Sequence, residues 1–186
     1  MGIPTLIKTL TASGSASLDF VDGTADVTFD STYDEYMFVF TDIAPATDSV
    51  EFQFQVNATD DAGGDYDTSL ITSTFFKAHH DEADSDTDLA YHTSHDQAQG
   101  SGHQTLAYDV GSDADQSVAG IMSLFSPSST TYVKHFYCRT SNAYSSDIMM
   151  DTFVAGYIND TTAIDEVQFK FSSGNFDGVI QLYGIA

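Results

Sequence analysis

The residues best suited to chemistry form an alternating run of carboxylates near the middle of the chain, at Asp84, Asp86 and Asp88. Carboxylates with this spacing converge on a hard cation in calcium-binding loops. The EF-hand pattern is incomplete, because Leu89 stands where that loop requires glycine and no glutamate follows at its last position. We therefore predict that Asp84, Asp86 and Asp88 bind Ca²⁺ in a loop. The alternative is an acidic loop that is only solvated.

Two further acidic runs and a group of histidines offer other ligands. Residues 60–65 and 113–115 are short Asp-rich turns that could each approach a cation or remain solvated. Five of the six histidines lie in one part of the chain, at His79, His80, His92, His95 and His103. Imidazole nitrogens bind transition metals, but an HxxH spacing without further ligands is not a zinc signature. We expect these histidines to be exposed or to lie at an interface.

The sequence carries none of the common catalytic signatures. It has no G-x-S-x-G motif, no phosphate-binding G-x-x-x-x-G-K-[ST] loop and no dinucleotide fingerprint. Its many carboxylates could form a pair at glycosidase spacing in almost any fold, so that possibility carries no information. We therefore predict a protein that is not an enzyme, with no catalytic residues and no cofactor apart from the Ca²⁺ considered above.

The net charge limits the classes of partner that the protein can bind. Five Lys+Arg stand against 28 Asp+Glu, which gives a formal net charge of −23. Such a chain repels phosphate backbones and anionic lipids, so we expect neither nucleic-acid nor membrane binding. Cys138 is the sole cysteine, which excludes an intramolecular disulfide and favours a buried strand residue. The N-terminus has no apolar region typical of a secretory signal, and no apolar run reaches membrane-spanning length.

The elements that must position these residues are strands, because apolar and polar residues alternate with a period of two. The clearest cases are residues 50–57 and 167–171, which predict half-buried strands with Phe52, Phe54, Phe169 and Phe171 facing the core. Further strands are expected in runs rich in aromatic and β-branched residues, namely 17–21, 26–29, 36–40, 71–76, 117–125, 131–139, 153–158 and 179–185.

The number of strands and the Asp-rich turns between them predict the fold class. About eight to ten short strands without a helical pattern favour a single antiparallel β-sandwich, with a jelly roll as the leading topology. We expect residues 1–186 to form one domain. Residues 77–115 interrupt the alternation, and we expect a long acidic, His-containing excursion there that holds one or two short strands.

Several short segments also have a familiar combination of residues: 31–36, 38–40, 43–48, 115–117, 125–131, 156–157, 172–176 and 180–185. Together these segments resemble virion structural proteins of marine tailed bacteriophages. The resemblance covers most of the chain but contains no catalytic motif. It implies a jelly-roll-like component of the virion, either a capsid decoration protein or a tail-associated protein, which works by packing against other virion proteins.

The residues and the resemblance agree on a non-enzymatic role. We expect a capsid decoration or cement protein on the particle surface, located in the virion. We expect it to form a homo-oligomer, a dimer or trimer, in which salt screens the repulsion between acidic subunits. A tail or tail-fibre component is the alternative within this class. A calcium-dependent carbohydrate-binding module is the alternative from another class.

Overall fold

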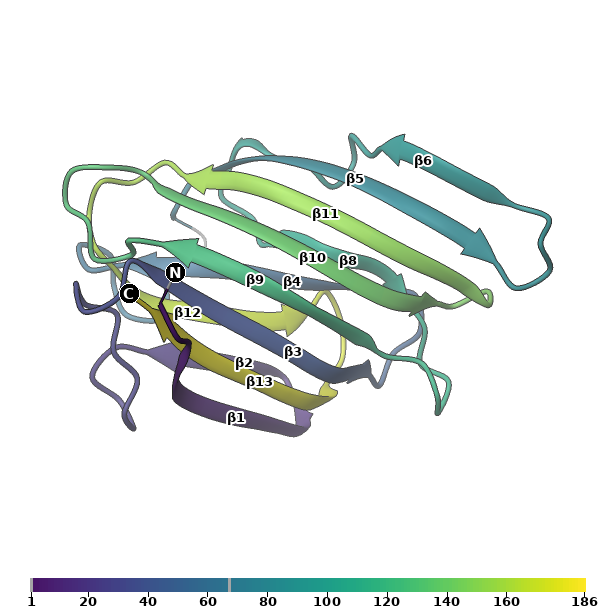
Figure 1. Cartoon of the computed structure of the whole chain (residues 1–186), viewed down its shortest axis with the longest axis horizontal. Helices are drawn as coiled ribbons and strands as arrows, with labels where there is room; N and C mark the ends of the chain where they lie inside the picture. The colour runs from purple at the N-terminus through teal and green to yellow at the C-terminus, as the bar shows by residue number, and fades with distance from the viewer. Residues whose placement is uncertain (1, 67) are drawn as a thin grey trace.

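The computed structural model describes residues 2–66 and 68–186. These residues form thirteen β-strands and no helix, which confirms the all-β class (Figure 1). In chain order the strands are β1 Thr5–Ser15, β2 Ser17–Val21, β3 Glu35–Pro45, β4 Val50–Ala58, β5 Ile71–Asp81, β6 Thr87–Tyr91, β7 Ala98–Gly100, β8 Gln104–Val110, β9 Val118–Phe125, β10 Lys134–Tyr144, β11 Ile148–Ile158, β12 Ile164–Phe171 and β13 Phe176–Ile185.

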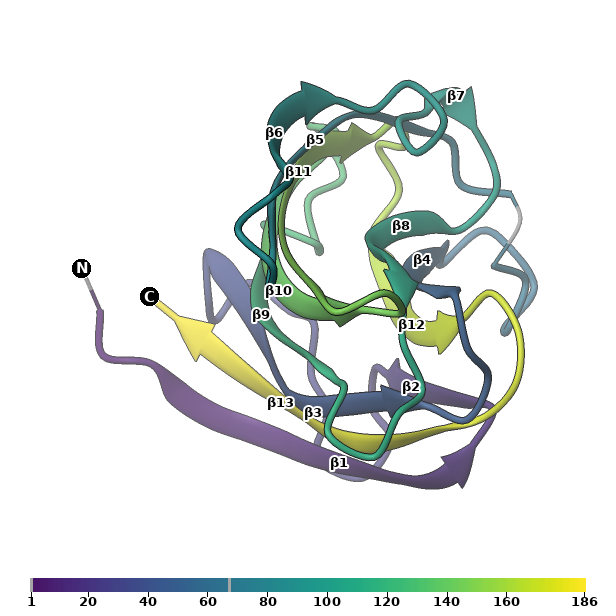
Figure 2. The same cartoon turned by 90° about the vertical axis from the view of Figure 1, so that its right-hand side faces the viewer.

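All strand pairs are antiparallel and belong to one sheet. The main path runs β1-β13-β3-β9-β10-β8-β4-β12-β2, and β11, β5, β6 and β7 branch from β10. The two ends of this path, β1 and β2, are joined by the single residue Ala16. The sheet therefore curls until it is nearly closed into a barrel (Figure 2). The link between β10 and β8 is one residue pair, Tyr144 with Val110, so the sheet turns a corner there.

A bulge explains part of this curvature. The register between β13 and β3 shifts between Asp177 and Val179, and Gly178 lies in the bulge with φ 138°. A Cβ atom at Gly178 would lie 2.6 Å from the carbonyl oxygen of Asp42. Glycine is required here for both reasons, since bulges bend a strand and this backbone conformation excludes other side chains.

Phenylalanine side chains fill the space between the facing parts of the curled sheet. Phe52, Phe54, Phe169 and Phe171 are all buried, as the alternation predicts. They meet aromatic residues from the other side of the barrel: the ring centroids of Phe38 and Phe169 lie 5.0 Å apart. Edge-to-face contacts of this kind stabilise a core by about 0.5–1.5 kcal/mol beyond the burial of their area. Cys138 is buried here too, and its burial raises the pKa of its thiol.

Three local expectations need correction. Residues 26–29 form no strand; Asp26 ends a turn, and the Asp22 side chain accepts a hydrogen bond from the Phe29 amide, 2.8 Å long. Strand β1 was not anticipated, because most of its side chains are exposed and its pattern is weak. Strand β4 is not half-buried along its whole length: Gln55 and Asn57, expected to face solvent, are fully buried. Gln55 donates to the carbonyl oxygens of Ser69 and Ser101, in the loops that cover this face.

The segment 77–115 contains the end of β5 and the strands β6, β7 and β8. Strand β8 is almost entirely buried, whereas β6 is largely exposed and lies at an edge of the sheet. Within the range of the expected excursion, residues 77–115, β6 and β7 lie at the edge of the sheet, whereas β8 is a core strand. Among residues 2–66 and 68–186, no helix has the length and apolar character needed to cross a membrane.

Candidate functional site

The predicted calcium ligands lie at the turn between β5 and β6. Asp84 occupies the turn itself, Asp86 follows it and Asp88 is exposed on β6. An oxygen of Asp84 lies 3.5 Å from Nε2 of His80, and an oxygen of Asp86 lies 3.3 Å from Nε2 of His79. Two of the three carboxylates thus face imidazoles of β5. The binding of Ca²⁺ by Asp84, Asp86 and Asp88 stays a prediction.

The Asp81 carboxylate organises this turn. It accepts hydrogen bonds from the backbone amides of Ser85 and Asp86, at 2.8 and 3.0 Å, and from the Ser85 hydroxyl. These bonds hold the pKa of Asp81 near 2, well below its usual 3.8, and the Ser85 hydroxyl makes the largest contribution. A carboxylate committed to its own backbone in this way shapes the loop and has less capacity for a cation.

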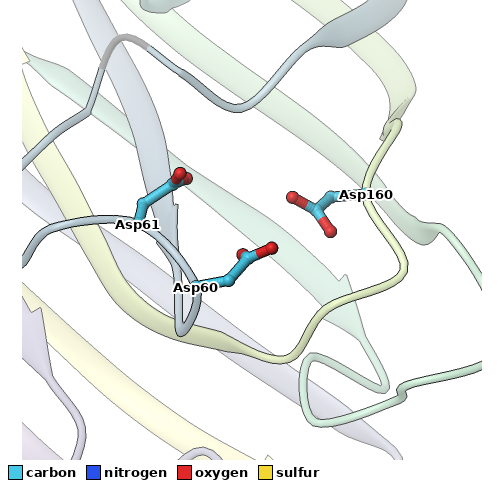
Figure 3. Close-up of side chains that lie close together, drawn as sticks. All are labelled: Asp60, Asp61 and Asp160. Carbon is cyan, nitrogen blue, oxygen red and sulfur yellow. The ribbon is translucent and has the colours of Figure 1, made fainter.

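A second group of carboxylates comes from two loops that are distant in sequence. Asp60 and Asp61 follow β4, and Asp160 precedes β12 (Figure 3). The pairing of β4 with β12 brings the two loops together, and the Thr59 amide donates to the Ala163 carbonyl oxygen at 2.9 Å. One carboxylate oxygen from each Asp lies within 4.8 Å of the others. Within the described residues, these three form the group whose ligand atoms converge closely enough for one ion.

Each member of this triad already has a hydrogen-bond donor. The hydroxyl of Thr162 donates to Asp60 at 3.2 Å, and the hydroxyl of Thr68 donates to Asp61 at 2.6 Å. The backbone amide of Thr162 donates to Asp160 at 2.6 Å. Oxygen ligands from Asp side chains are the type that Ca²⁺ prefers, although a full calcium shell has about six to eight of them.

A buried lysine supplies positive charge beside the triad. Lys134, at the start of β10, has 0% of its surface exposed. Its ammonium donates to the backbone carbonyl oxygens of Asp160, at 3.1 Å, and of Thr162. Burial lowers the pKa of Lys134 below its usual 10.5, and the negative charges of Asp160 and Asp60 oppose that effect. The protein thus offsets part of the triad's charge with a cation of its own.

Sequence reasoning considered Asp60 and Asp61 as possible ligands but missed Asp160 and Lys134. The Asn159-Asp160 pair signalled only a turn, because its proximity to Asp60 depends on the pairing of β4 with β12. The signal in the sequence that could have pointed to Lys134 is its isolated position as a basic residue in an acidic chain.

A cluster of rings occupies the space between β5 and β8. The imidazoles of His92 and His95 stack at a centroid distance of 4.7 Å, and both lie within 4.9 Å of the Tyr108 ring. Phe75 borders His95 at 5.2 Å. Burial lowers the pKa of both histidines, followed by the charge of Lys77 for His92 and that of His92 for His95. These two histidines are thus half-buried rather than exposed, and their location at an interface stays a prediction.

The outer face of the sheet carries a row of side chains that we call the outer ladder. The strand register places them directly opposite one another on β3, β9, β10, β11, β5 and β6, in the order Val39, Ile121, Arg139, Phe153, Phe76 and Tyr91. Figure 1 shows these six strands side by side. Ile121, Phe76 and Tyr91 are 45%, 39% and 50% exposed.

Aromatic and charged contacts join the members of the outer ladder. The rings of Phe76 and Phe153 stack almost parallel, 4.9 Å apart, and the Arg139 guanidinium lies 4.7 Å from the Phe153 ring centroid. Arg139 also makes a two-pronged ion pair with Asp151, with N–O distances of 3.0 and 2.8 Å. The positive charge of Arg139 is therefore matched within the face.

Two adjoining grooves lie along this face, and Ala119, Ser141 and Met149 line both. The first, of about 410 Å³, is bordered by the acidic residues Glu82, Asp115 and Asp147. We call it the acidic groove. The second, of about 490 Å³, contains Val39, Ile121 and the Arg139–Asp151 pair. We call it the apolar groove. Neither was foreseen, because each depends on which strands become neighbours.

Comparison of the chain with protein-family models, with curated proteins and with solved structures gives no match. Any proposal about its function therefore rests on the residues and surfaces described above.

Proposed function

We propose that the protein is a non-enzymatic structural component of a tailed-phage virion, namely a capsid decoration or cement protein on the particle surface. The observation that carries this proposal is the outer ladder, a row of exposed and half-exposed side chains that crosses six strands and is apolar or aromatic at every position except Arg139. Contiguous apolar surface on a soluble protein marks an interaction site more often than scattered single residues do. Aromatic residues and Arg are also the side chains enriched in protein–protein contacts.

The rest of the molecule suits this role. A continuous sheet with a phenylalanine core makes a rigid support for the outer face. The net charge of −23 keeps single subunits apart in dilute salt, and screening reduces that repulsion as ionic strength rises. The proposal therefore includes a homo-oligomer whose self-association strengthens with salt. Sedimentation at low and high salt measures this directly, and a monomer under both conditions would contradict it.

We also propose that the barrel is a variant of the jelly-roll-like sandwich. In support of this view, β8, β4, β12 and β2 form one run of neighbours, and their phenylalanines meet those of β3 across the core. Two layers in a cryo-electron microscopy map of the virion-bound chain are expected. A fully closed single barrel would argue against the jelly-roll relationship.

The experiment for the main proposal locates the chain on purified virions of the phage that encodes it. Immunoblotting is expected to find it, and cryo-electron microscopy is expected to place many copies on the capsid. Few copies confined to the tail would favour the tail or fibre alternative. Absence from virions would contradict the whole proposal.

A pair of variants connects virion binding to the outer ladder. Phe76→Ser with Tyr91→Ser removes two exposed rings of the ladder. The matched control is Tyr132→Ser, which removes a ring that is 74% exposed outside the ladder. The double variant is expected to bind depleted particles much more weakly than the control, with circular dichroism confirming that both are folded. Equal binding by all three proteins would remove the ladder from the proposal.

One observation favours a second candidate, a calcium-dependent carbohydrate-binding module. One carboxylate oxygen from each of Asp60, Asp61 and Asp160 lies within 4.8 Å of the others, and carboxylate oxygens are the ligand type that Ca²⁺ takes. A glycan array with and without a chelator tests this candidate. Chelator-sensitive binding that Asp160→Asn abolishes would support it, whereas an array without binding in millimolar Ca²⁺ would contradict it.

A further inference from the structure

We infer that the acidic groove and the apolar groove together bind a cationic, partly apolar segment of a partner protein, with Lys or Arg side chains in the first and apolar side chains in the second. This inference deepens the proposed function, because it names the chemistry of the partner that the outer face receives. The negative charge of this face complements the positive charge of such a segment.

The acidic groove gathers carboxylates from three separate connections. Glu82 comes from the β5–β6 turn, Asp115 from the β8–β9 loop and Asp147 from the β10–β11 hairpin. The Glu82 amide donates to the Asp147 carbonyl oxygen at 3.2 Å, so two of the connections are tied together. Ile148 and Met149 form part of its wall, and none of the residues that line it is Lys or Arg. A cationic side chain would therefore enter a groove whose charge is entirely negative.

The carboxylates of this groove remain available to a partner. Among the described residues, the side chains of Asp115 and Asp147 make no hydrogen bond or ion pair with another residue. This contrasts with Asp81 at the neighbouring turn, whose carboxylate already accepts three hydrogen bonds. Carboxylates without internal donors can form ion pairs with a partner without first breaking a bond.

Gly120 lines the apolar groove where β9 packs closely against β10. A Cβ atom at Gly120 would lie 2.5 Å from the Arg139 carbonyl oxygen and 2.9 Å from the Thr140 Cα, too close for any side chain. Ile121 and Val39 line the groove beside Gly120, and Met149, 48% exposed, lies between the two grooves. Arg139 is paired with Asp151 and so presents no unmatched positive charge to a cationic segment.

A second copy of the chain fits this face poorly. Each copy carries a net charge of −23, and its five cations are largely committed elsewhere. Lys134 is buried, Lys77 donates to the Tyr108 hydroxyl and Arg139 pairs with Asp151. Only the half-buried Lys8 and Lys170 remain to meet an acidic groove. The charge balance therefore favours a basic partner over self-association at this surface.

The test uses the full chain and two synthetic peptides as probes, one alternating Lys with Leu and one alternating Glu with Leu. Amide chemical shifts are expected to move at the residues lining the two grooves with the Lys-Leu peptide and to stay unchanged with the Glu-Leu peptide. Fluorescence anisotropy gives the affinity at low and moderate salt, and binding is expected to weaken as salt rises.

Matched variants localise the effect of charge. Asp115→Asn with Asp147→Asn is expected to weaken Lys-Leu binding about five-fold to ten-fold, since exposed ion pairs contribute little individually. Asparagine suits position 147, where φ is 59°. The control, Asp26→Asn with Asp34→Asn, removes the same charge from an exposed loop between β2 and β3 and is expected to change affinity less than two-fold. Ile121→Ser tests the apolar groove and is expected to weaken binding at every salt concentration.

Equal losses in the groove variant and the loop control would overturn the inference, because they would show attraction to net charge alone. Shifts spread over the whole surface, or equal binding of both peptides, would do the same. Self-association that Asp115→Asn with Asp147→Asn strengthens would identify a second copy as the occupant and also overturn it. Groove-specific binding by a chain that is absent from virions would uphold the inference while contradicting the proposed function.

Discussion

The phenylalanine core and the β5–β7 wing are built from the same antiparallel pairing but differ in what covers their faces. We use "wing" for residues 71–100. In the core, strands β2, β3, β4 and β12 all contribute phenylalanines. Five other phenylalanine rings surround Phe169, namely those of Phe20, Phe38, Phe40, Phe52 and Phe54. In the wing, β5 begins with buried residues but becomes half-exposed after Phe75. Strand β6 has no fully buried residue.

This difference indicates how stability is distributed. Apolar burial is the main favourable contribution to folding, whereas hydrogen bonds exposed to solvent contribute little in net terms. The core should therefore open only with global unfolding, and β6 and β7 should open locally at lower free energy.

Removing a ring from the centre of the core should have the largest effect. Phe169→Ala is expected to lower the free energy of unfolding by about 3–5 kcal/mol, because it removes buried contacts and leaves a cavity. Phe76→Ala, on the outer face of the wing, is expected to cost less than about 1 kcal/mol. Urea denaturation followed by tyrosine fluorescence measures both. Similar costs for the two variants would contradict the contrast.

A substitution at Lys134 tests whether this buried charged group contributes to the free energy of unfolding. Lys134→Met removes the donor to two carbonyl oxygens and is expected to lower the free energy of unfolding by about 1–3 kcal/mol. Lys170→Met, at a half-buried position on β12, is the control and should change it by less than about 0.5 kcal/mol. Thermal denaturation monitored by circular dichroism would reveal the difference. If Lys134→Met instead raised the free energy of unfolding, the buried ammonium would be shown to destabilise the folded protein.

The wing should respond to mild acid, whereas the core should not. The pKa values of His92 and His95 are lowered in the folded state, so the unfolded wing binds more protons. Stability from these groups is present above pH 6.5 and is lost as the pH falls below it. The charges that face the pair are Lys77 on β5, Asp109 on β8 and Glu51 on β4.

Hydrogen exchange at pH values on either side of 6.5, corrected for intrinsic rates, measures this response. The amides of β6 and β7 are expected to lose protection at the lower pH, while those of β4 and β12 keep theirs. The double variant His92→Gln with His95→Gln should abolish the pH dependence. An identical pH dependence in the variant would assign the effect to other groups.

The smallest effect is expected at the edge of the wing. Leu89 is 72% exposed on β6, so Leu89→Ser should change the free energy of unfolding by no more than about 0.5 kcal/mol. Chemical denaturation gives this value directly. A larger loss would show that the side chain is covered in solution.

The alternation of side chains was enough to identify strands and the direction of their core faces. Phe52, Phe54, Phe169 and Phe171 are predictable because a period of two assigns each to a face without knowledge of its neighbours. The burial of Gln55 was not predictable, because that face is covered by a loop fourteen residues away, at Ser69, and by a second loop further along the chain, at Ser101. Local patterns describe a strand but do not say what is packed on its other side.

The candidate sites depend more strongly on which strands become neighbours. Asp60 and Asp160 are separated by just over half of the chain and meet because β4 pairs with β12. Likewise, Ile121, Arg139 and Phe153 look like unrelated outward residues until the register of β9, β10 and β11 aligns them. Asp84, Asp86 and Asp88 were singled out because their spacing is visible along a single segment, but the structure places Asp84 in the turn and Asp88 on β6.

The positions of the five basic residues have a consequence for proteolysis. Lys8, Lys77, Lys134, Arg139 and Lys170 all lie within strands, in β1, β5, β10 and β12. Proteases that cleave after Lys or Arg need a locally extended, unpaired segment, and the loops of this protein offer them no such residue. The folded chain should therefore resist trypsin until a strand that carries a basic residue detaches. The rate of digestion would then report the opening of individual strands. Cleavage after Lys8 is expected first, because β1 is an edge strand.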